Sequence, residues 1–388
     1  MPLSEVADIL MGYPFESEQY NNNGLGIRLA RGMNIGSGNF NWDENSRWWN
    51  NLSDDLHSYY LQEGDIVIGM DGSRVGKNYA QVCKEDLPLL LVQRVACIRA
   101  KPGISQDFLW ACIASKNFEA YIDLIKTGTT IPHISGKQIG EYPIPLVSED
   151  EQQFIGRVSA ALIRKIRLNT QINANLASII DSIFTETIKS SQGETTRFGS
   201  MIKIGSGGTP KTAISEYWNG DIPFFSPKDV DGIYVYSTEK YITKMGLDNC
   251  NSGYYPKNTT FITARGTVGK IALAASNMAM NQSCYAISAN TLGQEHYIHQ
   301  LSLYAVGAIK QKSNGAIFDA INARDITEEL VPNVPLPRIE AFEKQATPLY
   351  EQIWKNGLEI ESLVHLRDYL LPKLMSGEID VSDLPLPN

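Results

Sequence analysis

Two short glycine-rich stretches follow strand-like runs and end in lysine, the residue types of a phosphate-binding loop. Residues 69–77 read GMDGSRVGK after the run DIVI, and residues 265–270 read RGTVGK after TTFITA. A P-loop needs G-x-x-x-x-G-K-[ST], so that backbone amides surround the phosphates and a hydroxyl reaches magnesium. In the first stretch the glycine spacing is one residue short, and Asn78 and Ile271 stand where the hydroxyl belongs. The stretches therefore predict glycine turns beside positive charge rather than a nucleotide site.

Other patterns typical of catalysis are missing from the sequence. Residues 24–26 and 205–207 both read G-x-G but lack the third glycine of a dinucleotide fingerprint, and there is no G-x-S-x-G nucleophile elbow. His296 and His299 could share a helical face, but no cysteine or acidic ligand is patterned nearby, so we interpret them as a surface or core pair rather than a metal site. We expect no catalytic residues, no cofactor and no bound metal.

Composition narrows the class of protein. With 388 residues the chain can form two or three domains, each with its own core. No apolar run approaches the roughly 18 residues of a membrane span, and the N-terminus lacks a signal-peptide pattern. The five cysteines never form C-x-x-C, which predicts reduced thiols in a cytoplasmic protein. The net charge of −9 counts against nucleic-acid binding unless a local basic surface or a basic partner supplies positive charge.

An internal repeat organises the chain. The element GSRVGK at residues 72–77 recurs as RGTVGK about half a chain length later, and QRVAC at 93–97 is followed by QSCYA at 282–286. Three more segments of the first half align in the same order with segments of the second half: 27–35 with 222–230, 128–139 with 315–326, and 142–148 with 334–340. Each match is weak, but their shared order indicates a tandem duplication.

A long helical pattern closes each half. In the first half it runs from about Asp150 to Lys189, and in the second we expect Pro348 to kink or restart the helix and Gly377 to stop it. Residues spaced by seven predict the helix-pair interface: Ile155, Leu162, Asn169, Leu176 and Ile183, then Phe342, Leu349, Asn356, Leu363 and Leu370. The partner positions are Val158, Ile172 and Ile179, then Ile353, Ile360 and Leu366. The simplest cover for each stripe is the other helix, paired antiparallel about a pseudo-two-fold axis, with Asn169 and Asn356 either fixing the register or facing solvent.

These features together resemble the specificity subunit of type I restriction–modification systems. The resemblance rests on two β-rich segments, each followed by a proline-rich step and a long helix, on RGTVGK and Gln282-Ser283, and on LRDYLLPKLMSGEI at 366–379. The order of Arg and Gly in the first turn departs from that of the second, which leaves the equivalence of Gly72 and Gly266 open. The resemblance implies an α+β fold, with two mixed α/β target recognition domains joined by two long antiparallel helices, a coiled coil.

The resemblance also implies separate roles for the segments of this chain and for its partner subunits. We expect target recognition domains at 1–147 and 193–337, spacer helices at 148–192 and 338–377, and a tail at 378–388. Each recognition domain would read half of a bipartite double-stranded DNA target, and the helix pair would set the spacer and dock two methyltransferase subunits. Restriction subunits with the motor would join them, and no membrane would be involved. Methylation and cleavage would be the work of these partners.

The candidates for DNA contact are lysines and arginines, because their contacts with phosphates supply the affinity for DNA, while contacts with base edges supply the sequence specificity. The candidates are Arg28, Arg31, Arg47, Arg74, Lys77 and Lys137 in the first half, and Lys211, Lys228, Arg265, Lys270, Lys312 and Arg324 in the second. Those in the glycine turns are favoured, since the backbone can approach closely there. The stretch NSRWWNN at 45–51 places aromatics beside arginine, although Trp48 and Trp49 also fit a partly buried position.

Two rival interpretations stay open. The chain could be a helical scaffold or adaptor that never touches DNA, or a ligand-binding or NTPase enzyme that uses the glycine turns. A specificity subunit could also serve a fused nuclease–methylase in place of separate methyltransferases. If the helices act as a ruler, about 36 residues at ~1.5 Å each give a rod of about 54 Å between half-sites.

Overall fold

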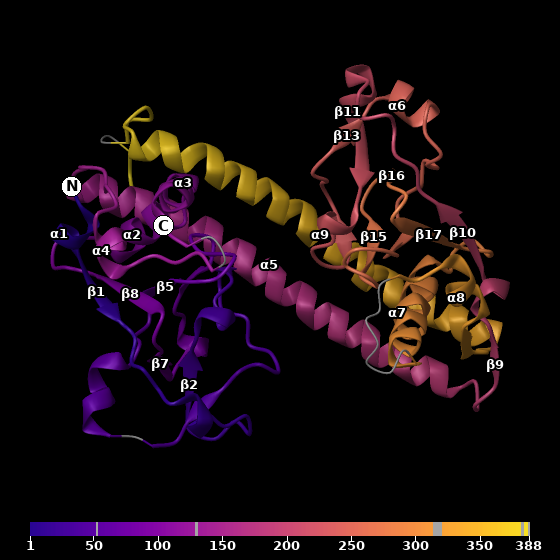
Figure 1. Cartoon of the computed structure of the whole chain (residues 1–388), viewed down its shortest axis with the longest axis horizontal. Helices are drawn as coiled ribbons and strands as arrows, with labels where there is room; N and C mark the ends of the chain where they lie inside the picture. Colours follow the sequence, from indigo (N-terminus) through magenta and orange to yellow (C-terminus); the bar gives the residue numbers. More distant parts are fainter. Residues whose placement is uncertain (52, 129–130, 313–319, 382–383, 387–388) are drawn as a thin grey trace. The chain divides into compact units, whose positions relative to one another are not determined.

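The computed structural model describes the chain except for residues 52, 129–130, 313–319, 382–383 and 387–388 (Figure 1). It divides into two compact units. The first unit consists of Met1–Leu168 with Ser362–Asn388, and the second unit of Asn169–Glu361. In the first unit, therefore, the two ends of the chain belong to one folded body.

A five-stranded sheet in each unit confirms the predicted duplication. The strand orders are β1-β8-β5-β6-β3 and β10-β17-β14-β15-β12, and in both sheets the last pair is parallel while the others are antiparallel. The first sheet contains β1 (Ala7–Met11), β3 (Ser37–Gly38), β5 (Ile66–Gly69), β6 (Tyr79–Gln81) and β8 (Val95–Ala100). The second contains β10 (Ile202–Ser206), β12 (Tyr234–Val235), β14 (Thr260–Thr263), β15 (Ile271–Ala274) and β17 (Cys284–Ala289).

A small three-stranded sheet repeats in the same way. Its central strand, β2 or β11, pairs antiparallel with one neighbour and parallel with the other. The strands are β2 (Ile27–Ala30), β4 (Trp48–Trp49) and β7 (Leu89–Leu91), then β11 (Trp218–Phe225), β13 (Tyr241–Ile242) and β16 (Ala279–Met280). The second unit adds the antiparallel pair of β9 (Thr195–Arg197) and β18 (Leu330–Pro332).

Helices cover the five-stranded sheets and complete the cores. In the first unit α2 (Gln106–Ile113) and α3 (Lys116–Ile125) share a core with β5 and β8, whose residues are almost all buried. In the second unit α7 (Glu295–Lys312) packs on β14 and β17. Strands β5 and β14 are buried along their whole length, and the buried stretch of β14 includes a threonine at each end.

Two short helices occupy equivalent places in the repeat. Helices α4 (Gly136–Gly140) and α8 (Ala323–Glu328) each begin with a capping box, formed by Ser135 with Gln138 and by Asn322 with Asp325. These helices lie in the aligned segments 128–139 and 315–326, of which residues 129–130 and 315–319 lie outside the described part of the chain. The remaining short helices are α1 (Leu3–Val6) and α6 (Lys244–Asp248).

The two long helices are α5 (Glu149–Lys189) and α9 (Leu336–Met375), drawn in magenta and yellow in Figure 1. Helix α9 continues through Pro348, so the helix does not restart there, and a kink at this proline stays a prediction. Pro348 is exposed, and the carbonyl that it leaves without an intrahelical donor can bind water instead. The helix ends just before Gly377, which has a φ of +74° and provides the expected stop.

The histidine pair belongs to the core of the second unit. His296 Nδ1 lies 3.0 Å from Glu343 Oε2, and His299 Nδ1 lies 2.8 Å from the Tyr350 hydroxyl, so both histidines join α7 to α9. Within the described residues there is no cluster of side chains that could hold a metal ion. None of the described helices is long and apolar enough to cross a membrane.

Candidate nucleic-acid interface

The two glycine-lysine stretches are the loops of equivalent β-hairpins. The first joins β5 to β6 and the second joins β14 to β15, both antiparallel. A P-loop presents its amides at the start of a helix, whereas here a strand follows each turn. The turns therefore have no helix N-terminus with which to bind a nucleotide phosphate.

Each turn contains two glycines with left-handed backbone. Gly72 and Gly76 have φ of 94° and 86°, and Gly266 and Gly269 have φ of 78° and 73°. The second glycine of each pair also packs closely against a helix. A Cβ on Gly76 would lie 2.8 Å from Cβ of Ile122 in α3, and one on Gly269 would lie 2.3 Å from Cε of Lys310 in α7. The first glycines meet nothing within 4 Å.

The arginines take different places in the two turns. Arg74 lies between its glycines, and its Nη2 donates to Ser37 Oγ at 3.0 Å, while Arg265 precedes the first glycine. The first turn has one more residue between its glycines than the second, so Gly72 and Gly266 share a conformation but not an aligned position. Both arginines, with Lys77 and Lys270, are exposed. The Lys270 ammonium lies 3.4 Å from the Val230 carbonyl oxygen.

A second group of candidates gathers on the three-stranded sheet of the first unit. We call it the arginine–aromatic cluster, and it consists of Arg28, Arg31, Arg47, Tyr20, Trp42 and Trp48. The Arg28 guanidinium lies 4.6 Å from the Trp42 ring centre and 6.0 Å from that of Trp48. Trp49, in contrast, is buried in a small aromatic core. Of the adjacent tryptophans, only Trp48 therefore takes part in the cluster.

Arg31 and Arg47 complete this cluster at the end of β2. The Arg31 guanidinium lies 5.4 Å from the Tyr20 ring, and its Nη1 donates to the Asn45 carbonyl at 3.1 Å. Arg47 donates to the Ser46 carbonyl at 2.8 Å. Burial lowers the pKa of Arg31, and the positive charge of Arg47 adds to this effect. Positive charge is thus concentrated where aromatic rings are half-buried, an arrangement that suits a polyanion with stacked bases.

In the second unit a cleft of about 500 Å³ brings Lys228 and Arg265 together. Lys228 follows β11 and Arg265 comes from the glycine turn, and Lys240 and Trp218 line the same cleft. The Lys240 ammonium lies 5.6 Å from the Trp218 ring centre. The Lys228 ammonium is 3.7 Å from Glu239 Oε2 in a solvent-exposed pair, which holds it weakly. The cleft therefore combines three cations with an aromatic wall.

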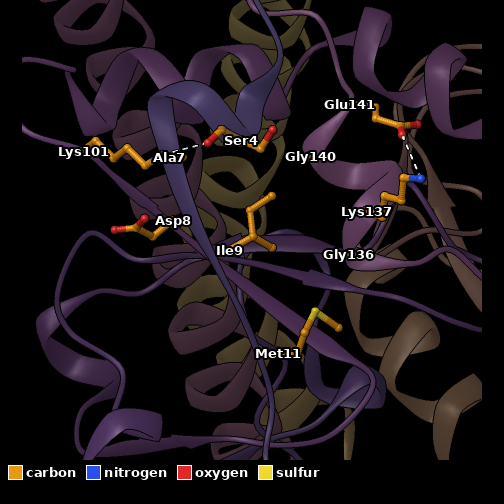
Figure 2. A pocket seen from close by; sticks show the side chains of 10 residues that line it. All are labelled: Ser4, Ala7, Asp8, Ile9, Met11, Lys101, Gly136, Lys137, Gly140 and Glu141. Carbon is orange, nitrogen blue, oxygen red and sulfur yellow. Dashed lines mark hydrogen bonds and ion pairs between the residues drawn. The ribbon is translucent and has the colours of Figure 1, made fainter.

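The remaining candidates lie apart from these groups. Lys137 lines a pocket of about 660 Å³ in the first unit with Lys101, Asp8 and Glu141, so the charges there are mixed (Figure 2). The Lys312 ammonium lies 2.6 and 2.8 Å from the two oxygens of the nearly buried Glu329, which gives it a structural ion pair. Lys211 and Arg324 are exposed, Lys211 before β11 and Arg324 in α8.

Sequence reasoning missed Trp42, Trp218 and Lys240. These side chains lie beside the candidate residues only because segments that are distant in the chain come into contact. The only local indication was the density of aromatic and basic residues around NSRWWNN.

Within the second unit, α5 and α9 pair antiparallel. Asn169 Nδ2 donates to Glu359 Oε2 at 2.7 Å, and Asn356 Nδ2 donates to Asn173 Oδ1 at 2.8 Å. Farther along, the Phe184 and Phe342 rings lie 6.0 Å apart. As the residue numbers of the contacts increase along α5, those of their partners decrease along α9, as in an antiparallel pair. Both asparagines singled out by the heptad are buried, at 2% and 5% exposure, and join the helices through hydrogen bonds.

The covered face of α5 differs from the predicted stripe. Ile172 and Ile179 are 36% and 48% exposed, whereas Ile180 and Phe184 are buried, and Leu176 and Ile183 are half-buried. A straight helix drifts against a seven-residue repeat, and Phe184 also turns toward Tyr297 of α7 at 5.9 Å. The placement of Ile172 and Ile179 in the seam is therefore wrong. Leu349 packs beside the second core.

In the first unit, the other predicted interface residues are unequally buried. Ile155 is fully buried in the core that also contains Leu371 and Leu374 of α9, and Leu370 packs beside it. Leu162 and Leu363 are half-buried. The expected partner residue Leu366 is 44% exposed, so it does not belong to the seam.

Comparisons with known proteins agree with this architecture. The family described as "Type I restriction modification DNA specificity domain" matches residues 1–178 and again 191–349. The type I restriction enzyme MjaIX specificity subunit of Methanocaldococcus jannaschii is 25% identical over 337 residues, covering 80% of this chain and 77% of that protein. The EcoAI specificity subunit of Escherichia coli is 36% identical over 156 residues, which cover 39% of this chain and 26% of that protein.

A solved structure supports the fold over the whole chain. The type I restriction-modification system S subunit from M. genitalium superimposes with a TM-score of 0.60 at 16% identity, covering 96% of this chain and 95% of that chain. Two matches to one family domain, in a chain whose two halves repeat the same sheet topology, leave one conclusion. The chain belongs to the type I restriction modification DNA specificity family and carries the family's domain twice.

Proposed function

We propose that the chain is the non-catalytic DNA-recognition subunit of a type I restriction–modification complex. Each half reads one part of a bipartite double-stranded DNA target. The observation that carries this proposal is the repeated architecture, in which each unit presents basic residues beside aromatic rings on the same pair of sheets.

The basic groups fit DNA despite the acidic net charge. The arginine–aromatic cluster in the first unit and the cleft with Lys228, Lys240 and Arg265 in the second are local concentrations of positive charge. The glycine turns add exposed Arg74 and Lys77 to the first unit. Phosphate contacts from such groups supply affinity, and ordered side chains near bases supply specificity.

The long helices are the proposed spacer and the docking surface for two methyltransferase subunits, which restriction subunits would then join. Exposed Ile172 and Ile179 leave apolar surface on α5 for such a partner. Removing seven residues from both helices should shorten the helical rise by about 10 Å, which is about 3 base pairs at ~3.4 Å each. A methylated target whose spacer keeps its length would contradict this role.

The decisive experiment is methylome sequencing of cells that carry the methyltransferase with and without this chain. We expect one bipartite methylated motif that is lost when the chain is removed. Exchanging residues 1–147 for those of another family member should change only one half of that motif. A motif that persists without the chain, or changes in both halves after the exchange, would refute independent reading.

A further inference from the structure

The Arg28 guanidinium lies over the rings of two tryptophans, and no carboxylate of the described residues pairs with it. Arg99 and Arg167 form ion pairs with aspartates in the same unit, whereas Arg28 forms no ion pair with any described residue. Its guanidinium lies 4.6 Å from the Trp42 ring centre, and Trp48 lies directly across the strand pair from it. Its Nε is buried without a hydrogen-bond partner among the described residues, which leaves the two terminal nitrogens as its available donor fork.

Trp42 is itself fixed by two contacts. Its ring stacks on Phe40 with centres 4.8 Å apart and planes 10° from parallel. Its Nε1–H donates to Asp86 Oδ1 at 3.0 Å. The indole that carries Arg28 therefore has little rotational freedom.

Asp86 is tied to the long helix α5. It is 5% exposed, and its Oδ2 accepts from the Cys83 backbone N–H at 3.0 Å and from Arg167 Nη2 at 3.3 Å. Arg167 Nη1 also donates to Cys83 Sγ. Burial raises the pKa of the Cys83 thiol, so the negative charge that faces Arg167 is that of Asp86. A continuous series of contacts thus runs from α5 through Asp86 and Trp42 to Arg28, all within the first unit.

We propose that Arg28 is a specificity-determining residue that reads a guanine edge in one half of the target, and that Asp86 and Arg167 are positioning residues for it. A phosphate contact needs only positive charge and tolerates a mobile side chain. A bidentate contact to guanine O6 and N7 needs a guanidinium fork in a fixed plane, which the indole contacts provide. The inference rests on the proposed function and specifies how one half-site is read.

The test measures the methylated motif in cells that express full-length variants with the methyltransferase, using the cells' own genomic DNA. Arg28→Lys keeps the charge but removes the fork. We expect it to lower the preference for guanine at one position of one half by about tenfold, within the range for a single bidentate contact. Asp86→Asn and Arg167→Met should relax the same position by a smaller factor.

Two comparisons separate positioning from simple loss of stability. The control Arg99→Met removes another ion pair to a nearly buried aspartate, Asp65, and should leave the motif unchanged. In a chain that already carries Arg28→Lys, Asp86→Asn should relax the motif no further, because it acts only through Arg28. Hydrogen exchange of the purified chains should show the first unit folded in each variant.

Four results would overturn the inference. An unchanged motif with Arg28→Lys would mean that Arg28 does not read a base. Relaxation by Arg99→Met, or additive relaxation in the double variant, would mean that Asp86 and Arg167 act through general stability. A wild-type chain that directs no bipartite methylation would overturn the proposed function itself, and this inference with it.

Discussion

Replacing the two glycines of the first turn by alanine should have very different costs. Both Gly72 and Gly76 have left-handed backbone, so each alanine should destabilise the first unit by about 1–2 kcal/mol. A Cβ at Gly72 would face open space, so the conformational cost is the whole cost of Gly72→Ala. Gly76→Ala places a methyl group 2.6 Å from Cγ2 and 2.8 Å from Cβ of the fully buried Ile122.

The contact with Ile122 sets the larger effect. Its Cβ moves only with the backbone of α3, so an overpacking cost of about 1–3 kcal/mol adds to the conformational cost. We expect about 2–5 kcal/mol for Gly76→Ala against about 1–2 kcal/mol for Gly72→Ala. Hydrogen–deuterium exchange of peptides from β5, β6 and α3 reports the free energy of opening for this unit separately from the other.

Gly269 in the second unit provides a matched comparison. An alanine there would meet Cε and Nζ of Lys310, the mobile end of a long side chain, and Val306 Cγ1 at 3.0 Å. Gly269→Ala should therefore cost less than Gly76→Ala. Equal opening free energies for the Gly72 and Gly76 variants would refute the reasoning, because they would show that α3 does not press on the turn.

Three further predictions concern the second unit. Asn356→Ala should destabilise it by about 1–3 kcal/mol in urea unfolding, because the buried Asn356 side chain loses its hydrogen bonds to Asn173 of α5 and to Gln352 of its own helix; an unchanged midpoint would mean that solvent replaces them. Burial, together with the neighbouring histidine, lowers the pKa of His299 from 6.5 to about 3. Above pH 6.5 His299 is neutral in both states, whereas below pH 6.5 it gains a proton in the unfolded state only, so the free energy of unfolding falls as the pH falls. Between pH 7 and pH 5 the wild type should lose about 2 kcal/mol more unfolding free energy than His299→Gln, and equal losses would contradict the assignment. Arg265→Met should lower the slope of log affinity against log salt by about one for DNA binding with the methyltransferase, whereas Lys312→Met should reduce stability and leave that slope intact.

The sequence predicted the duplication and both long helices because those features depend on order and periodicity. Aligned motifs such as residues 27–35 and 222–230 correspond to β2 and β11, the central strands of matching sheets. The seam between the helices was harder to predict. A heptad describes a helix with one partner, but α5 also packs on α7 and on α2, so Ile172 and Ile179 are displaced from the covered face. The continuity of α9 through an exposed proline likewise depends on solvent access that a sequence does not show.

The candidate interface was predictable only as a set of residue types. Arg28, Arg31 and Arg47 could be named because they are basic, and Arg47 also stands beside tryptophans in the sequence, but the selection of Trp42 and Asp86 as supports for Arg28 requires contacts between separate segments. Lys312 was equally plausible in the sequence. Its pairing with the nearly buried Glu329 is a tertiary contact and gives that lysine a structural role.

The division of the chain into units has a consequence for its synthesis on the ribosome. Leu371, Leu374, Met375 and Val381, near the C-terminus, belong to the core of the first unit, and Lys116 of α3 pairs with Asp368 at 2.9 Å. The second unit is contiguous, so it can finish folding while the N-terminal part still lacks its last core residues. At translation rates of ~5–20 residues per second, the 220 residues after Leu168 delay completion of the first unit by roughly 10–45 s. A nascent chain that stops short of α9's last turns would consequently leave its oldest segment, rather than its newest, with an unfinished core.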